Sequence, residues 1–266
     1  MTSEKMLHNI DSNTKTVHIE TGNMLNMNNI MLKVWQSPVD ELVECLKIVA
    51  KDSQDTPPVP EDGLLKIGPS KNINESANSF DVEDKKDLKI NVKVFVTNTD
   101  KNTLTDAVNE ALSSLGTDSI DSLVLACPCS DETLNEKSLP CLQELWRVLE
   151  DFVERKQIVS VGLSNIDTQV FIALYNWAKI KPSIVQVNLA TCCVVPPALQ
   201  EFSKQNDIQL NTTSDPADIL PKDSLKEVLE PSLPFGLVWI FRYQVQVKCR
   251  GVLANKGYVV CCQRTV

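Results

Sequence analysis

Residues 142–165, LQELWRVLEDFVERKQIVSVGLSN, combine a helix pattern with a strand pattern. Apolar side chains recur at three- and four-residue spacing through the first half, which predicts a helix that packs one apolar stripe against another element. The apolar run over 158–163 predicts a strand covered on both faces, which Gly162 and Ser164-Asn165 end in a loop. The stripe comprises Leu142, Leu145, Trp146, Leu149, Phe152 and Val153, and the side expected to face water carries Glu144, Arg147 and Glu150.

The same alternation of strand and helix continues along the chain. The sequence predicts a helix over 168–179, a strand over 184–189, a helix entered through Pro196-Pro197, and a strand over 208–210. Successive strands start about 25 residues apart, which requires crossover connections and therefore parallel strands. A doubly wound sheet and a (β/α)8 barrel both satisfy this spacing, and both place function in loops at the carboxyl ends of strands. Those loops are 164–166, 190–195 and 211–214.

The amino-terminal half adds four expected strands and two expected helices. One helix starts at Asp40 after Pro38, and the other starts at a capping box over Thr103–Asp106 and ends at Gly116. We expect residues 1–16 to be a loose segment and residues 17–266 to form one domain, because the length suits a single α/β barrel. The expected strands are 17–20, 64–67, 88–96 and 122–126.

The carboxyl end has two interpretations. Residues 239–247 alternate apolar and polar side chains, which taken alone predicts a strand, but their position after a strand and a loop predicts a helix. We favour the helix. Residues 251–254 would then form the eighth strand, close to the end of the chain.

Composition excludes several classes of partner and location. A net charge of −9, a pI near 4.9 and the lack of a basic cluster argue against nucleic acid or an anionic membrane surface. Neither a hydrophobic segment of signal-peptide length nor a membrane span is apparent, so we expect a cytoplasmic protein. In that compartment the nine cysteines are expected to be reduced thiols, and their spacing does not suit a zinc site.

Two segments carry a resemblance to a known family. WRVLEDFVERKQIVSVGLSN, with LGTDSIDSLVLACP before it, resembles the aldo-keto reductases, which are NADPH-dependent (β/α)8 barrels. Further segments resemble one non-catalytic branch, the regulatory (modifier) subunits of glutamate-cysteine ligase, over nearly the whole chain. They are TVHIETGN, QVNLATCCVVPP, NDIQL with SDP, and RYQVQVKCRGVLANKGYVV. The resemblance implies a (β/α)8 barrel of aldo-keto reductase type, here with a shortened or degenerate second strand and carboxyl-terminal end.

The reductase family uses an Asp-Tyr-Lys-His tetrad, and its positions do not match here. The family's Lys falls on Asn98, and its His falls on Ala126, or on Cys127 if the register shifts. The Asp and Tyr find no match over 51–70, which contains no tyrosine. A positioned proton donor contributes roughly 10² to 10⁴ in rate, so the resemblance implies a protein that is not a reductase.

Part of the family's cofactor pocket is matched. Ser164, Asn165 and Gln186 match residues that hydrogen-bond the nicotinamide carboxamide, whereas the ring-stacking aromatic falls near Thr212 and a phosphate contact falls on Lys256. No cofactor is then required, and NADPH would bind weakly. The alternative is that Ser164-Asn165 only caps the following helix.

The branch implies a regulator that forms a heterodimer with the ligase catalytic subunit. It would raise turnover and glutamate affinity and reduce feedback inhibition by glutathione; the alternatives are an active NADPH-dependent reductase or a thiol-based redox sensor. Five cysteines in a strand-end loop or near the carboxyl end are candidates for thiol contact with the partner, although the first two would equally serve as small buried hydrophobes. They are Cys192, Cys193, Cys249, Cys261 and Cys262.

Overall fold

The computed structural model describes residues 10–11, 13–27, 37–53, 60–68, 87–128, 138–189, 194–229, 233–248 and 250–265. The chain divides into two compact units. Unit 1 comprises Met1–Leu88 and Asp218–Val266, and unit 2 comprises Lys89–Ala217. The assignment of residues 17–266 to one domain stays a prediction.

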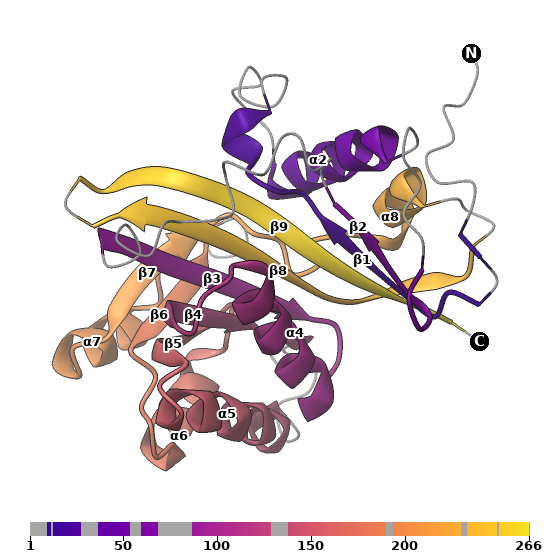
Figure 1. Cartoon of the computed structure of the whole chain (residues 1–266). Helices are drawn as coiled ribbons and strands as arrows, with labels where there is room; N and C mark the ends of the chain where they lie inside the picture. The colour runs from indigo at the N-terminus through magenta and orange to yellow at the C-terminus, as the bar shows by residue number, and fades with distance from the viewer. Residues whose placement is uncertain are drawn as a thin grey trace. The chain divides into compact units, whose positions relative to one another are not determined.

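Unit 2 is built on a parallel sheet in the order β3-β4-β5-β6-β7. A helix follows each of the first four strands, and the helices pack against one another in chain order (Figure 1). This alternation confirms the parallel strands predicted from the strand spacing. The strands are β3 (Leu88–Val96), β4 (Ile120–Ala126), β5 (Ile158–Ser164), β6 (Ile184–Asn188) and β7 (Gln209–Thr213). The helices are α4 (Lys101–Ser114), α5 (Ser138–Glu154), α6 (Thr168–Trp177) and α7 (Pro197–Gln205).

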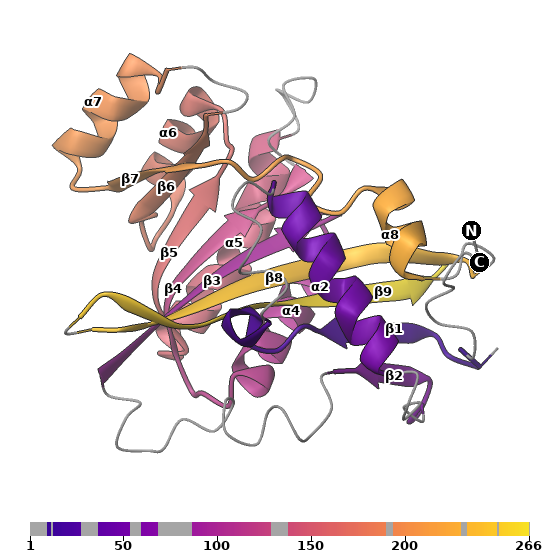
Figure 2. The same ribbon diagram turned by 90° about the horizontal axis from the view of Figure 1, so that it is seen from above.

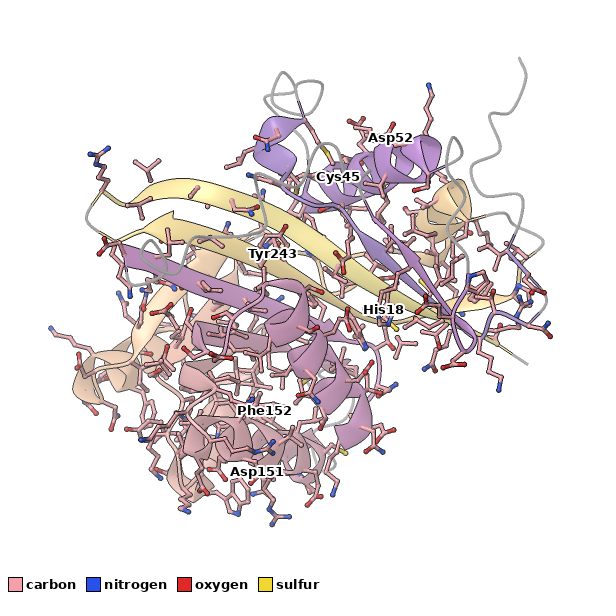
Figure 3. The ribbon with its side chains drawn as sticks, viewed as in Figure 1. His18, Cys45, Asp52, Asp151, Phe152 and Tyr243 are labelled. Carbon is pink, nitrogen blue, oxygen red and sulfur yellow. The ribbon has the colours of Figure 1, made fainter. Side chains whose placement is uncertain are left out.

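The predicted apolar stripe of α5 lies in the core. Five of its six side chains are fully buried, Phe152 among them (Figure 3). The prediction that Glu150 faces water is wrong, because its Oε1 accepts a hydrogen bond of 2.8 Å from the Ile180 backbone N–H. One turn earlier, the Trp146 indole N–H donates to the Ile180 carbonyl at 2.9 Å. The helix therefore holds both backbone groups of Ile180 in the loop before β6.

Gly162 lies inside β5 and does not end it as predicted. A Cβ atom at this position would be 2.4 Å from the Ile184 carbonyl oxygen and 2.5 Å from the Ile184 Cβ. Gly162 and Ile184 are direct partners in the β5–β6 pairing. The glycine thus permits a close approach of two backbones within the sheet.

Unit 1 contains a sheet in the order β2-β1-β9-β8. β1 runs parallel to β2 and antiparallel to β9, and β8 and β9 form a long antiparallel pair. Helix α2 crosses this sheet beside α8 (Figure 2). The strands are β1 (Thr16–Glu20), β2 (Leu64–Ile67), β8 (Phe235–Val247) and β9 (Val252–Arg264); the helices are a single turn η1 (Met24–Asn26), α2 (Pro38–Asp52) and α8 (Lys222–Val228). The four-residue β2 agrees with the shortened second strand that was predicted.

The carboxyl end is antiparallel, and the helix expected over 239–247 is wrong. The alternation of apolar and polar side chains correctly indicated a strand. Its apolar members on β8 are all buried: Trp239, Phe241, Tyr243 and Val245. The strand expected over 251–254 is only the start of β9, which continues to Arg264. The place of residues 239–247 in the chain predicted a helix wrongly, because strands and helices no longer alternate in this part of the chain.

The ends of α4 test the predicted cap signals. Asp100, not the expected box over Thr103–Asp106, is the N-cap, and its side chain accepts from the Asn102 backbone N–H at 3.0 Å. At the other end Gly116 has φ +56°, as a C′ glycine requires. The Asp100 carboxylate cap places the helix start three residues before the predicted Thr103.

Candidate functional site

Ser164, Asn165 and Gln186 lie together at the carboxyl ends of β5 and β6. Ser164 and Gln186 are partners in the parallel pairing, and the Asn165 backbone N–H donates to the Gln186 carbonyl at 2.9 Å. Asn165 has φ +56°, a conformation that asparagine tolerates better than most residues. The structure thus brings together the three residues that the sequence singled out, on adjacent strands.

The alternative role of Ser164-Asn165 as a helix cap is wrong. Asp167 is the N-cap of α6, and its Oδ1 accepts from the backbone N–H groups of Gln169 at 2.8 Å and Val170 at 3.1 Å. This carboxylate provides the acceptor that a helix start needs. Ser164 and Asn165 are therefore available for another role.

Lys93, which the sequence reasoning missed, is the centre of the site. It lies in β3 with only 5% of its side chain exposed. Its Nζ donates to the Ser164 hydroxyl oxygen at 2.8 Å and pairs with Asp215 Oδ2 at 2.7 Å. The ammonium also lies 5.1 Å from the centre of the Phe95 ring. A lysine within the apolar run NVKVFV was the signal that could have revealed it, since an unpaired buried lysine is very costly.

Asp215 extends this ion pair into a network that reaches four strands. Its Oδ2 also accepts from the Thr213 hydroxyl at 2.8 Å, and its backbone carbonyl accepts from Asn188 Nδ2 at 2.8 Å. With Lys93 and Ser164, the network joins β3, β5, β6 and the end of β7. A buried pair of this kind needs further hydrogen bonds to offset the loss of hydration, and Ser164 and Thr213 each provide one.

The donors and acceptors of the site suit a carboxamide but not a whole dinucleotide. Asn165 Oδ1 and Gln186 Oε1 are buried with no hydrogen-bond partner among the described residues, and either could accept from an amide N–H. Ser164 accepts from Lys93, which leaves its own O–H as a donor. In contrast, Thr212 on β7 is exposed and offers no ring, and Lys256 Nζ is held by both Glu41 oxygens at 2.6 and 2.8 Å.

Asn98 and Ala126, on which the family's Lys and His are expected to fall, lie at the ends of β3 and β4. Asn98 is exposed in the loop after β3, where its Oδ1 accepts from the Asp100 backbone N–H at 3.0 Å. Ala126 is the last residue of β4, and Cys127 follows it half-buried. Asn98 therefore acts as a turn residue.

A second polar cluster, in unit 1, is unsuited to acid–base chemistry. The Tyr258 hydroxyl donates a hydrogen bond of 2.9 Å to Glu41 Oε1. The same carboxylate also accepts from Lys256 Nζ. Burial raises the pKa of Tyr258 above its ordinary value of 10.0, and it does the same for Tyr243 (Figure 3). A general acid works best with a pKa near the operating pH, so this shift is in the wrong direction.

The described cysteines near the carboxyl end are buried. Cys261 and Cys262 lie in β9, 1% and 0% exposed, where β9 pairs with β1 and β8. Burial raises the pKa of the Cys262 thiol to about 12, which suppresses the reactive thiolate. Residues 252–264 form an internal strand, so Cys261 and Cys262 do not lie on an accessible tail. Cys192, Cys193 and Cys249 lie outside the described residues.

Comparison with known proteins identifies two levels of similarity. Residues 68–215 match the model of the aldo/keto reductase family, which confirms the predicted aldo-keto reductase type of α/β fold. The chain is 34% identical to the glutamate-cysteine ligase regulatory subunit of Homo sapiens over 261 residues, 94% of this chain and 93% of that protein. The corresponding protein of Rattus norvegicus is also 34% identical, over 260 residues and the same shares. Within the described ranges, no helix is long and apolar enough to span a membrane.

Proposed function

Because this chain belongs to the aldo/keto reductase family, in the branch of the glutamate-cysteine ligase regulatory subunits, we propose that it regulates glutamate-cysteine ligase. In this proposal it forms a heterodimer with the ligase catalytic subunit in the cytoplasm. It raises turnover and glutamate affinity and reduces inhibition by glutathione, and so promotes glutathione synthesis. The observation that carries the proposal is the similarity to regulatory subunits over 94% of this chain.

Co-purification with the catalytic subunit, followed by glutamate kinetics, tests this function. The ligase rate is measured over a range of glutamate concentrations with and without the chain, and again with added glutathione. We expect a higher kcat, a lower KM for glutamate and weaker inhibition in the complex. Failure to co-purify, or unchanged kinetics in a complex that does form, would refute the regulatory role.

The proposed regulator is not itself a catalyst. Asn98 and Ala126 stand where the reductase family has its Lys and His, and neither side chain transfers a proton at neutral pH. The buried Tyr258 with its raised pKa offers no substitute. An active reductase, the rival hypothesis, would therefore lack the family's Lys and His at these two positions.

The proposal requires no cofactor. Ser164, Asn165 and Gln186 would hold a carboxamide, but the ring would lack a stacking partner at Thr212 and the phosphate would compete with Glu41 for Lys256. Each missing contact reduces the net free energy of binding that remains after the cost of association. We therefore propose that NADPH binds weakly if it binds at all.

Thiol regulation, if it operates, is proposed for the three cysteines outside the described residues. In the sequence, Cys192 and Cys193 come after β6, and Cys249 comes between β8 and β9. A disulfide to the partner at these positions would form under oxidising conditions and could report redox state. Cys261 and Cys262 are too deeply buried to take part without unfolding of β9.

A further inference from the structure

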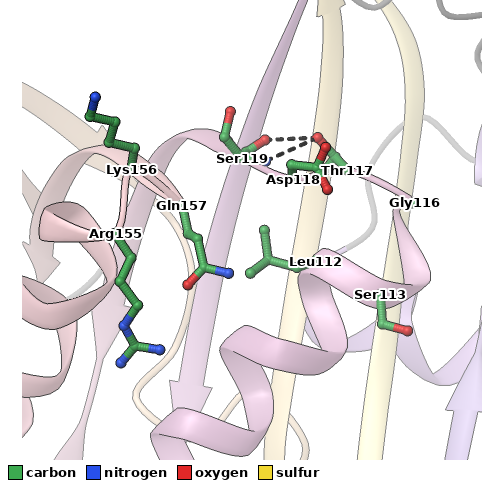
Figure 4. Close-up of a pocket in the computed structure, with 9 residues that line it drawn as sticks. All are labelled: Leu112, Ser113, Gly116, Thr117, Asp118, Ser119, Arg155, Lys156 and Gln157. Carbon is green, nitrogen blue, oxygen red and sulfur yellow. Dashed lines mark hydrogen bonds between the residues drawn. The ribbon is translucent and has the colours of Figure 1, made fainter.

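Unit 2 carries an open recess of about 780 Å³ that the proposed function does not use (Figure 4). It lies between the turn that follows α4 and the turn that follows α5, at the amino ends of β4 and β5. Arg155 and Lys156 form one rim, and Asp118 lies on the opposite side (Figure 4). The recess is open, with a lining that is about equally polar and apolar, which suits contact with another protein better than enclosure of a metabolite.

The two turns share one hydrogen-bond motif but differ in their key residue. After α4, the Thr117 N–H donates to the Leu112 carbonyl at 3.1 Å and the Gly116 N–H donates to Ser113 at 3.0 Å. After α5, the Gln157 N–H donates to Phe152 at 3.0 Å and the Lys156 N–H donates to Val153 at 2.9 Å. Both are Schellman turns, whose left-handed position favours glycine.

That left-handed position is Gly116 after α4 but Lys156, with φ +62°, after α5. A side chain at positive φ is strained relative to glycine. The chain therefore keeps a cation at the recess where glycine would be conformationally better.

Arg155 adds a second, pre-positioned cation. Its guanidinium lies 4.9 Å from the centre of the Phe152 ring, an arrangement that limits its motion. No described carboxylate forms an ion pair with Arg155 or Lys156, although the chain carries a net charge of −9. Two cations that are neighbours in sequence and form no ion pair with a described carboxylate provide charge complementarity for anionic groups.

Asp118 restricts which anion fits. It is exposed and would repel a polyanion such as a nucleic acid or a phosphate cluster. Separate carboxylates avoid this repulsion when they lie on the side of Arg155 and Lys156.

Resting on the proposed function, we propose that this recess docks an acidic segment of the ligase catalytic subunit, with Arg155 and Lys156, whose side chains extend in opposite directions, contacting separate carboxylates (Figure 4). Cations at the end of a helix also interact favourably with the helix dipole, so a purely structural role is the competing explanation. The two explanations differ for Lys156→Gly. A structural role predicts lower stability, whereas a docking role predicts an equal or higher Tm together with weaker binding.

The experiment measures affinity for the purified catalytic subunit by surface plasmon resonance at two salt concentrations, with Tm recorded for each variant. Charge reversal in the double variant Arg155→Glu/Lys156→Glu should weaken binding about tenfold or more, because it places the new carboxylates against an acidic partner. Lys156→Gly should weaken binding about twofold to fivefold, the range of an exposed ion pair. The matched control, Lys204→Glu/Lys222→Glu, makes the same charge change at exposed lysines outside the recess and should change affinity less than about twofold.

Three outcomes would overturn the site. They are wild-type affinity in the Arg155/Lys156 reversal, an equal loss in the control reversal, and a lower Tm with unchanged affinity in Lys156→Gly. A wild-type chain that does not bind the catalytic subunit would refute the proposed function and with it the partner assigned here. Normal binding that is insensitive to the reversal would refute the recess alone.

Discussion

Lys93 Nζ lies 2.7 Å from Asp215 Oδ2, although the two residues are 122 positions apart in the chain. Their side chains are 5% and 2% exposed, so neither charge is hydrated to any useful extent. Each charge is therefore tolerated only in the presence of the other. This interdependence makes the pair a sensitive probe of the interior of unit 2.

Removal of one partner of this pair should destabilise the protein strongly. Lys93→Met or Asp215→Leu should each cost about 3–5 kcal/mol, because an uncompensated charge stays buried. The double variant Lys93→Met/Asp215→Leu should recover much of that loss. Urea unfolding measures all three free energies, with Lys204→Met as an exposed control. Additive losses in the double variant would contradict the coupling.

Gly162→Ala should disrupt the β5–β6 pairing. The new Cβ would lie 2.4 Å from the Ile184 carbonyl oxygen, so the strands must separate, at a cost of about 1–3 kcal/mol or more. Gly68→Ala is a suitable control, since its nearest neighbour would be the Glu20 Cβ at 4.0 Å. Thermal unfolding compares the two. Equal Tm values would show that the sheet adjusts without loss.

Carbonyl reduction should be absent. We expect no NADPH oxidation with a broad panel of aldehydes, and weak or undetectable NADPH binding by calorimetry, because the proton-relay and ring-stacking residues are replaced. Turnover that Ser164→Ala or Gln186→Ala abolishes would contradict this prediction. Tight binding without turnover would show that the pocket is functional for binding alone.

Alkaline pH should destabilise unit 1. Burial raises the pKa of Cys45 and of Cys262 from an ordinary 9.0 to about 12, the first with a smaller effect from Glu41. In the unfolded chain these thiols lose protons from about pH 9, so folding stability is complete below pH 9 and falls as pH rises towards 12. The loss is about 1.4 kcal/mol per pH unit for each thiol. Cys45→Ala/Cys262→Ala should flatten the profile measured by urea unfolding; an unchanged slope would contradict the assignment.

Substitution of the cysteines should distinguish thiols that contact the partner from thiols that only pack in the core. Cys192→Ser/Cys193→Ser/Cys249→Ser should reduce oxidant-dependent complex formation on non-reducing gels and activation of the partner, if thiols act at the interface. Cys261→Ala/Cys262→Ala should alter stability but not these responses, since both thiols are buried. Unchanged behaviour when all five are replaced would leave a purely non-covalent regulator.

Local periodicity and spacing predicted most of the strands and helices. The stripe of α5 and the spacing of β5, β6 and β7 were readable because side-chain burial repeats along each element. The failure at β8 came from a choice between two signals, in which chain order was preferred to the alternation around Trp239. Strand register with β9 is a long-range property that a single segment does not contain.

The candidate site was predictable only in part. Ser164, Asn165 and Gln186 were found because a family resemblance pointed to them. Lys93 and Asp215 were missed because their pairing depends on contact across 122 residues, which periodicity does not encode. Likewise, the burial of Glu150 depends on the Ile180 backbone N–H, which another segment supplies.

Strand β9 completes unit 1 with the last residues of the chain, Val252–Arg264, inserted between β1 and β8. During translation, residues 89–217 leave the ribosome as one continuous segment and can fold while synthesis continues. β1 must wait for a strand that is made more than 200 residues later before it can acquire its antiparallel neighbour. A premature stop that removes β9 would therefore spare the continuous segment and leave the amino-terminal strands unpaired on one side, exposed to chaperones and proteases.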